Sequence, residues 1–258
     1  ILKAGQTEES KTAIESHTGA IAGSIDMFKT GINQVGIIEA ENTRQLFNYM
    51  MTFSWSKPMK GKKIAIVTNA GGPGIVATDS VIKGGLQMAK LSKNLKKKIQ
   101  KFLPPESSLK NPIDIIGDAK AERYQYPIDE LAKNDDVDAV LVLLTPQHVT
   151  QIEETAKIIL NATQMYEKPI VPVFLGKKQT SIGTQIFYDN YIPIFTEIDD
   201  AVSSLKVLSD YYMRVDSFSR REVNKKWGKI TSKEKGKFSK EIEKYVKKIT
   251  NPILKDLT

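Results

Sequence analysis

The chain has 258 residues and a formal net charge of +8; 40% of its residues are hydrophobic and 26% charged, so it can form one large domain or two small ones, and disorder throughout is excluded. It contains no cysteine, which excludes disulfides, thiolate catalysis and cysteine-ligated metals and fits a reducing, cytoplasmic location. No apolar run approaches the roughly 18 residues of a membrane-spanning helix and no signal peptide opens the chain, so we expect no membrane partner.

The first five residues, Ile-Leu-Lys-Ala-Gly, are typical of the end of a buried strand. No turn signal precedes them, which predicts that the chain is cut from a longer polypeptide. A polar loop is expected over residues 6–16. The apolar spacing then predicts a helix at 20–29, a short strand at 35–39 and a second helix at 42–52.

A second α/β pattern starts after the Pro- and Gly-containing linker at 57–62. Its apolar segments predict strands at 64–68, 86–91, 139–144, 170–174 and 194–196. Helices are expected at 75–83, 93–102, 122–133, 150–165, 179–189 and 199–212. Continuous apolar strands that alternate with helices indicate a parallel sheet with helices on both faces. Ligands of such sheets collect beyond the carboxyl ends of the strands, which points here to loops 69–74, 111–119 and 145–149.

The positive charge is concentrated at the end of the chain. Residues 213–258 hold 14 Lys and Arg against 6 Asp and Glu, whereas residues 1–212 hold 24 of each. A nucleic-acid surface would gather basic residues on a folded face together with aromatic side chains. The last segment instead has charges of both signs at helical spacing, with an apolar stripe at Ile242, Tyr245, Val246 and Ile249. We interpret 213–258 as a basic helical linker or tail and expect no nucleic-acid partner.

Residues 69–74, Asn-Ala-Gly-Gly-Pro-Gly, connect a predicted strand to a predicted helix and are called the glycine loop below. Glycines let the backbone approach a ligand, and a helix start offers unpaired N–H groups with about half a positive charge. Proline in the first turn gives up only a donor that has no intrahelical partner. Residues 73–77 include no Asp or Glu, so the first turn leaves room for an anion. The alternative is a tight connection in which the glycines serve packing.

Two named phosphate motifs fit the glycine loop poorly. Gly72-x-Gly74-x-x-Ala77 matches a relaxed dinucleotide fingerprint, but Lys90-Leu91-Ser92 stands where an acidic residue should end the second strand. No Gly-Lys-Ser/Thr follows the glycines, which excludes the Walker pattern. An NAD-dependent oxidoreductase is an alternative that rests on this relaxed pattern alone.

A second motif, Ser-His-Thr-Gly-Ala-Ile-Ala-Gly, occupies residues 16–23. It places His17 among small residues directly before a predicted helix start. Neutral imidazole is nucleophilic, and the helix start would stabilise a phosphoryl group that it accepts. The expected first turn, residues 19–23, contains no carboxylate. We interpret His17 as a phosphate acceptor that shares one phosphoryl group with the glycine loop; a histidine that caps the helix is the alternative.

These motifs resemble those of ADP-forming acyl-CoA synthetases, relatives of succinyl-CoA synthetase. Residues 16–23 are similar to the phosphohistidine loop of that family, and Lys3-Ala4-Gly5 precedes it as the same tripeptide does there. Residues 67–79 and 111–119 resemble two further motifs in the family's order. Succinyl-CoA synthetases usually carry Gly-His-Ala-Gly, so Ser16 and Thr18 favour the acyl-CoA branch.

The resemblance implies a domain order and a reaction. Residues 1–56 would be the C-terminal part of a CoA-ligase α/β domain, 62–212 a flavodoxin-like CoA-ligase domain and 213–258 the tail. The reaction would interconvert acyl-CoA, ADP and phosphate with acid, CoA and ATP through a phosphohistidine. Its partners would be a small organic acid and, in a homo- or hetero-oligomer, a CoA-binding Rossmann domain and an ATP-grasp domain or subunit that holds the nucleotide and Mg²⁺. A non-catalytic scaffold module of a fused acyltransferase is the alternative.

The resemblance also implies site residues. His17 would be catalytic, and phosphate would be bound by Thr18, Gly19, Asn69, Gly71, Gly72, Pro73 and Gly74. Apart from the resemblance, Asp114 and Asp118 are candidates to face the phosphate site or a magnesium ion, with a turn-stabilising role as the alternative. Asp79 is a candidate supporting residue near the phosphate, with a cap contact as the alternative. No metal ligand is expected in this chain.

Overall fold

The structure of the chain, a computed structural model, describes residues 1–18, 23–227 and the single positions 240, 244 and 248. It separates into two compact units, Ile1–Met50 and Met51–Thr258. The apolar stripe predicted in the tail lies outside the described residues. Among the helices that the structure describes, none is both long and apolar enough to cross a membrane.

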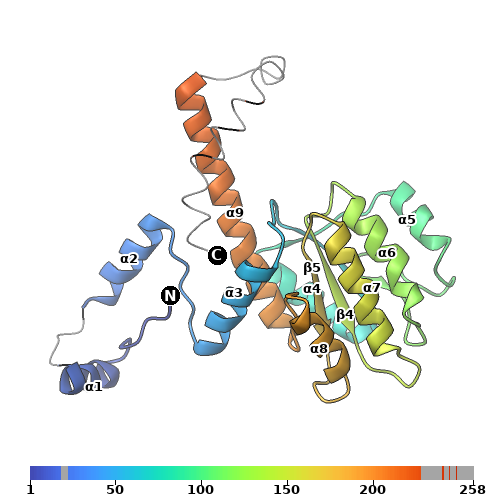
Figure 1. Cartoon of the computed structure of the whole chain (residues 1–258), viewed down its shortest axis with the longest axis horizontal. Helices are drawn as coiled ribbons and strands as arrows, with labels where there is room; N and C mark the ends of the chain where they lie inside the picture. The colour runs from blue at the N-terminus through green and yellow to red at the C-terminus, as the bar shows by residue number, and fades with distance from the viewer. Residues whose placement is uncertain (19–22, 228–239, 241–243, 245–247, 249–258) are drawn as a thin grey trace. The chain divides into compact units, whose positions relative to one another are not determined.

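The first unit contains α1 (Glu8–Thr18), α2 (Ile25–Val35) and the start of α3 (Thr43–Trp55), all visible in Figure 1. The chain's first residues run beside the segment before α3. Leu2 forms a parallel bridge with Ala40, and the Ala40 N–H donates to the Ile1 carbonyl at 2.8 Å. Ala40 lies one residue beyond the strand predicted at 35–39, and Val35 ends α2, so that strand prediction is wrong.

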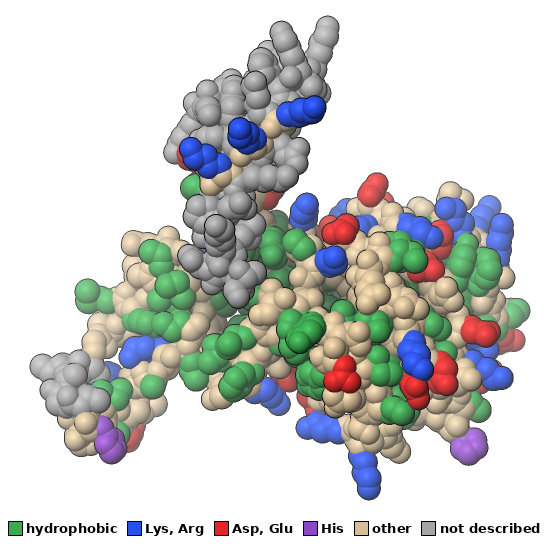
Figure 2. All heavy atoms as spheres, in the orientation of Figure 1, with side chains coloured by type: hydrophobic (Ala, Val, Ile, Leu, Met, Phe, Trp, Pro, Cys, Tyr) green, Lys and Arg blue, Asp and Glu red, His purple; other side chains and the backbone are tan. Residues whose placement is uncertain are grey.

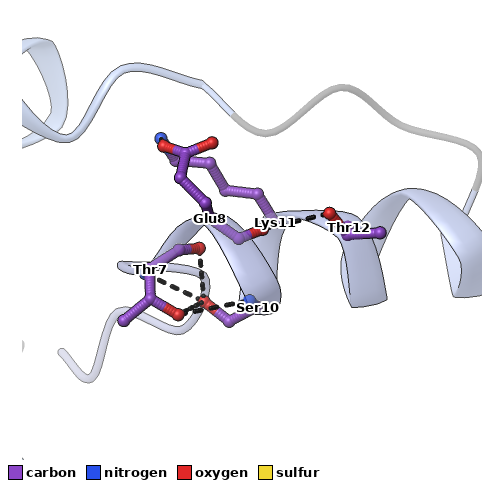
Figure 3. Close-up of polar contacts among 5 residues, drawn as sticks. All are labelled: Thr7, Glu8, Ser10, Lys11 and Thr12. Atoms are coloured by element: carbon purple, nitrogen blue, oxygen red, sulfur yellow. Dashed lines mark hydrogen bonds and ion pairs between the residues drawn. The ribbon is translucent and has the colours of Figure 1, made fainter.

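The loop predicted over residues 6–16 is wrong from residue 8 onward, because α1 begins at Glu8 and ends at Thr18 (Figure 3). The Ser10 N–H donates to Thr7 Oγ1 at 3.3 Å, while the Thr7 N–H donates to Ser10 Oγ at 3.0 Å. This reciprocal cap supplies partners for donors that an N-terminal helix end leaves unpaired. Glu8 and Glu9 add negative charge to the first turn, where the helix dipole favours it. Local capping therefore starts α1 although its sequence lacks a continuous apolar stripe.

The second unit is built on a parallel sheet of short strands (Figure 1). Its strands are β1 (Lys63–Thr68), β2 (Gln87–Met88), β3 (Ile113–Asp114), β4 (Ala139–Leu144) and β5 (Ile170–Phe174). The order is β2-β1-β4-β5, and β3 pairs with the last two residues of β1. In register, Ile64 of β1 lies opposite Ala139 of β4, and all pairings are parallel. The predicted fold class, a parallel sheet with helices on both faces, is confirmed.

Alternate residues of β1 face two separate apolar cores. Ala65 and Val67 pack with α5 (Lys93–Gln100), α6 (Glu122–Lys133), α7 (Ile152–Met165) and α8 (Ser181–Asp189). Ile64 and Ile66 pack on the other face with α4 (Gly71–Lys83) and α9 (Ile198–Trp227). All four of these β1 side chains are fully buried, so β1 lies in the interior of the second unit and is covered on both faces.

Several boundaries differ from those predicted. The strand expected at 86–91 pairs over two residues only, and 194–196 contributes a single bridge between Phe195 and Val173. The helix expected to end at residue 212 continues to Trp227, which places the predicted boundary at 213 inside α9. On the face drawn in Figure 2, acidic and basic side chains of the second unit lie side by side.

The packing of α9 generates a stability prediction. Leu205 is 1% exposed in the core that α9 shares with α4 and β1. We expect Leu205→Ala to lower the free energy of unfolding by about 2–5 kcal/mol, because it leaves a cavity. Arg214→Ala, at an exposed position of the same helix, should change it by less than about 0.5 kcal/mol. Urea unfolding followed by circular dichroism measures both, and equal effects would contradict the packing.

Candidate functional site

The glycine loop leaves the carboxyl end of β1, between β3 and β4. Ala70 is the extended residue that precedes α4, and it has no side chain that could cap the helix. Gly71, Gly72 and Pro73 form the first turn, in which no acidic residue stands. The N–H groups of Gly71 and Gly72 belong to the helix end that has no intrahelical acceptors. A helix start of this kind attracts anions through its N–H groups and its dipole.

The space beside Gly72 is open. An ideal Cβ at this position would meet nothing within 4 Å, and both Gly71 and Gly72 are exposed. Gly74 differs, because its Cβ would lie 3.1 Å from Thr68 Cγ2 and 3.4 Å from Pro112 Cβ. Gly74 is buried, and its N–H already donates to the Ala70 carbonyl at 3.3 Å. In this geometry close packing requires the glycine, and its N–H is used within the helix; phosphate binding by Gly74 stays a prediction.

Asn69 has a fully buried side chain whose amide joins two loops of the same sheet edge. Its Nδ2 donates to the Thr145 carbonyl at 2.8 Å, and the Thr145 N–H donates to its Oδ1 at 2.8 Å. Both ends of the amide are used by backbone groups after β4. The side chain therefore positions the glycine loop, and phosphate binding by Asn69 stays a prediction.

Thr68 fixes the first residue of the turn. Its Oγ1 donates to the Ala70 carbonyl at 2.9 Å and accepts from the Ala70 N–H at 3.1 Å. The Thr68 carbonyl accepts from the Ile115 N–H at 2.8 Å, which holds the loop after β3 against β1. Sequence reasoning missed Thr68 because a threonine that ends an apolar strand has no distinctive spacing.

Asp114 brings a negative charge to the start of α4. One carboxylate oxygen, Oδ1, accepts from the Ile116 N–H at 2.9 Å in a local turn. The other, Oδ2, lies 3.3 Å from the point where a Cβ on Gly71 would stand. The first turn of α4 is free of acids in its own sequence, but a carboxylate from the neighbouring strand borders it. The negative charge of Asp114 also acts on Tyr124 of α6: burial raises the pKa of the Tyr124 hydroxyl, and the charge of Asp114 raises it further.

Asp118 and Asp79 have ion-pair partners of their own. Asp118 pairs with Arg123, and its side chain is 70% exposed. Asp79 pairs with Lys83 at 3.7 Å on the exposed surface of α4. Both carboxylates are thus paired with neighbouring cations, and their roles near the phosphate stay a prediction. Among the described residues, no group of three His, Asp or Glu side chains could hold a metal ion.

His17 lies in the last turn of α1 with an exposed side chain, and Thr18 ends that helix. The next helix, α2, begins at Ile25 after the N-cap Ser24 and carries Asp26 in its first turn. His17 is thus not placed directly before an acid-free helix start, and that part of the interpretation is wrong. A helix carbonyl end carries partial negative charge, so α1 itself does not favour an anion at His17. Gly19 lies outside the described residues.

Comparison with known families decides the relationship. Residues 64–217 match the Ligase-CoA domain, and residues 1–53 match the succinyl-CoA ligase-like flavodoxin domain. The chain belongs to the Ligase-CoA domain family. The resemblance to ADP-forming acyl-CoA synthetases drawn from the motifs is confirmed.

Characterised relatives of this Ligase-CoA chain are larger. It is 31% identical over 208 residues to 4-hydroxybutyrate–CoA ligase [ADP-forming] of Nitrosopumilus maritimus, which covers 81% of the chain and 30% of that protein. It is 33% identical over 211 residues to acetate–CoA ligase [ADP-forming] I of Archaeoglobus fulgidus, with 82% and 30% covered. It is 31% identical to acetate–CoA ligase [ADP-forming] II subunit alpha of Pyrococcus furiosus, and the match covers 80% of the chain and 46% of that protein. The chain thus spans about a third to a half of these relatives.

A solved structure supports the same relationship. The dinucleotide-forming acetyl-coenzyme A synthetase 1 of Ca. Korarchaeum cryptofilum, in complex with phosphate and ADP, superposes with a TM-score of 0.77 at 31% identity. The similarity covers 86% of the present chain and 48% of that one. It therefore extends over most of the Ligase-CoA chain, in fold as well as in sequence.

The Asn69 amide generates a pH-dependent prediction. Asn69→Asp still accepts from the Thr145 N–H but loses the donor to the Thr145 carbonyl and buries a carboxyl group. Burial raises the pKa of such a carboxyl in the folded state, so its stability deficit grows as the pH rises above its unfolded pKa of about 4. Asn69→Ala should cost about 1–3 kcal/mol at every pH. Chemical unfolding at pH 5 and pH 8 measures both, and a pH-independent deficit of Asn69→Asp would contradict the prediction.

Proposed function

We propose that this chain is the phosphate-handling part of an ADP-forming acid–CoA ligase. The proposal rests on one observation above the others: the Ligase-CoA domain presents an open, uncapped helix start at Gly71 and Gly72, at the sheet edge where ligands of parallel sheets bind. The matches of both units to CoA-ligase domains support it. So do relatives named ADP-forming CoA ligases.

The proposed reaction proceeds in three balanced steps. Phosphate attacks the thioester carbonyl of an acyl-CoA, which forms an acyl phosphate and releases CoA. An imidazole nitrogen of His17 then attacks phosphorus; the bond to the carboxylate oxygen breaks and the acid leaves. ADP finally takes the phosphoryl group from His17, which gives ATP and free histidine. Each step is reversible, so the same residues serve acid activation by ATP.

The glycine loop would act on the phosphoryl group by electrostatics. The backbone N–H groups at the start of α4 are held in place by the bonds of Thr68 and Asn69, so they need not reorganise when charge develops on phosphate oxygens. The carbonyl end of α1 offers no such stabilisation to a phosphorylated His17. The proposed transfer therefore needs positive charge from another part of the enzyme.

The remaining substrates would bind to other parts of the enzyme. The relatives are about two to three times as long as the aligned segment, and one of them is named as a subunit alpha. This supports a CoA-binding Rossmann domain and an ATP-grasp domain or subunit as partners, in a homo- or hetero-oligomer. Nucleotide and Mg²⁺ would bind to the ATP-grasp part. The acid is proposed only as a small carboxylic acid.

The covalent step predicts that His17 carries the phosphate. The complete assembly, incubated with ATP labelled at its γ-phosphate, should yield an acid-labile, base-stable phosphoprotein. His17→Asn should abolish the label, because no nucleophile remains there. His148→Asn is the matched control: it removes the other histidine of the chain, which is exposed, and should leave the label intact. Label that persists in His17→Asn would overturn the assignment and favour the scaffold alternative.

The proposed anion site predicts a much larger loss of turnover for Gly72→Asp than for Gly72→Ala. Gly72→Ala adds a neutral methyl group into open space, whereas Gly72→Asp adds a negative charge where phosphate should bind. We expect Gly72→Asp to lower turnover by about 10²–10³, the loss typical of a disrupted oxyanion contact, and Gly72→Ala to lower it far less. Steady-state rates of the complete assembly, with folding checked by circular dichroism, measure this. Equal rates for the two variants would refute an anion site.

A further inference from the structure

The loop that follows β3 lies directly against the glycine loop. It comprises residues 115–119 and is called the β3 loop below. Its first residue, Ile115, donates its N–H to the Thr68 carbonyl at 2.8 Å. A Cβ on Gly117 would stand 3.7 Å from the Asn69 carbonyl. Any displacement of the β3 loop therefore changes the surroundings of the α4 start.

The backbone of the β3 loop is held in an uncommon conformation. Ile116 has φ 71°, in the left-handed region that a β-branched side chain rarely adopts. Two bonds accompany it: the Ile116 N–H donates to Asp114 Oδ1 at 2.9 Å, and the Ala119 N–H donates to the Ile116 carbonyl at 3.1 Å. A residue in this region is strained and persists only where its surroundings fix it.

Arg123 supplies a further constraint from outside the loop. It stands in the first turn of α6, where the helix dipole disfavours a cation, yet its side chain is only 22% exposed. Its Nη1 donates to the Ile115 carbonyl at 3.1 Å and to the Asp118 carboxylate. One guanidinium group thus joins both ends of the β3 loop. The planar fork of arginine suits such a double contact better than the point charge of lysine.

We propose that Arg123 is a positioning residue for phosphate: it fixes the β3 loop, and through the contacts of that loop with Thr68 and Asn69 it fixes the start of α4 in the geometry that binds the anion. The inference rests on the proposed function of the glycine loop. Arg123 itself is assigned no contact with phosphate; the bonds that its Nη1 donates go to Ile115 and Asp118. Without it, the β3 loop loses these two bonds, and phosphate meets a less ordered helix start.

The test is a comparison of Michaelis constants in the complete assembly. Inorganic phosphate is varied at fixed ADP and a fixed acyl-CoA, chosen from acetyl-CoA and 4-hydroxybutyryl-CoA by turnover. We expect Arg123→Gln to raise the KM for phosphate about 10–100-fold, as misplaced binding groups do, with the KM values for ADP and acyl-CoA unchanged. Arg123→Lys should restore part of the loss. The control Lys157→Gln removes an exposed ion pair with Glu153 on α7 and should change none of these constants.

Two outcomes would overturn the inference. One is a phosphate KM of Arg123→Gln equal to that of Lys157→Gln; the other is an equal rise of all three KM values. If Arg123→Gln does not fold, Asp118→Asn removes the same ion pair from its exposed side, and an unchanged phosphate KM in that variant counts against the inference. Failure of the proposed function is separate: it shows as unlabelled His17 or equal rates for Gly72→Asp and Gly72→Ala.

Discussion

The end of β1 is the constraint on which the candidate site depends. The strand is buried on both faces, so the buried polar groups of the turn that follows it need hydrogen-bond partners within the protein. Thr68 and Asn69 provide those partners within two residues, through Ala70 on one side and Thr145 on the other. The N–H groups of Gly71 and Gly72 at the exposed helix start receive no side-chain cap from Ala70, so they are open to an anion.

Periodicity predicts the second unit well and the first unit poorly, for a physical reason. Strands such as β4 are buried on both faces, so their sequences are apolar throughout and bounded by turns. β3 pairs over two residues, and its position is set by the neighbouring Val67 and Thr68 rather than by its own sequence. α1 forms through a cap and surface charges, which a search for an apolar stripe does not detect. Likewise, α9 continues past residue 212, and no local signal in the sequence marks where this helix ends.

The candidate site shows the same limit at the level of single residues. A motif gives residue types in order, but the direction of each side chain depends on contacts from distant segments. Asn69 turns inward because Thr145, in the loop after β4, offers it a donor and an acceptor, and Gly74 is required by Pro112. Arg123 has no motif around it. A cation in the first turn of a helix opposes the helix dipole, however, and this unfavourable placement can be recognised from the sequence.

The carboxylate of Asp114 gives the proposed site a balance of charge. The start of α4 attracts anions, and Asp114 Oδ2 already lies at its border, 3.3 Å from the position of a Cβ on Gly71. A phosphoryl group that binds there gains the helix N–H groups but meets one negative charge, so its binding is weaker than an isolated helix start would give. For a group that must be passed on, weak binding of the resting state is an advantage, because stabilisation shared by bound and transition states does not speed transfer.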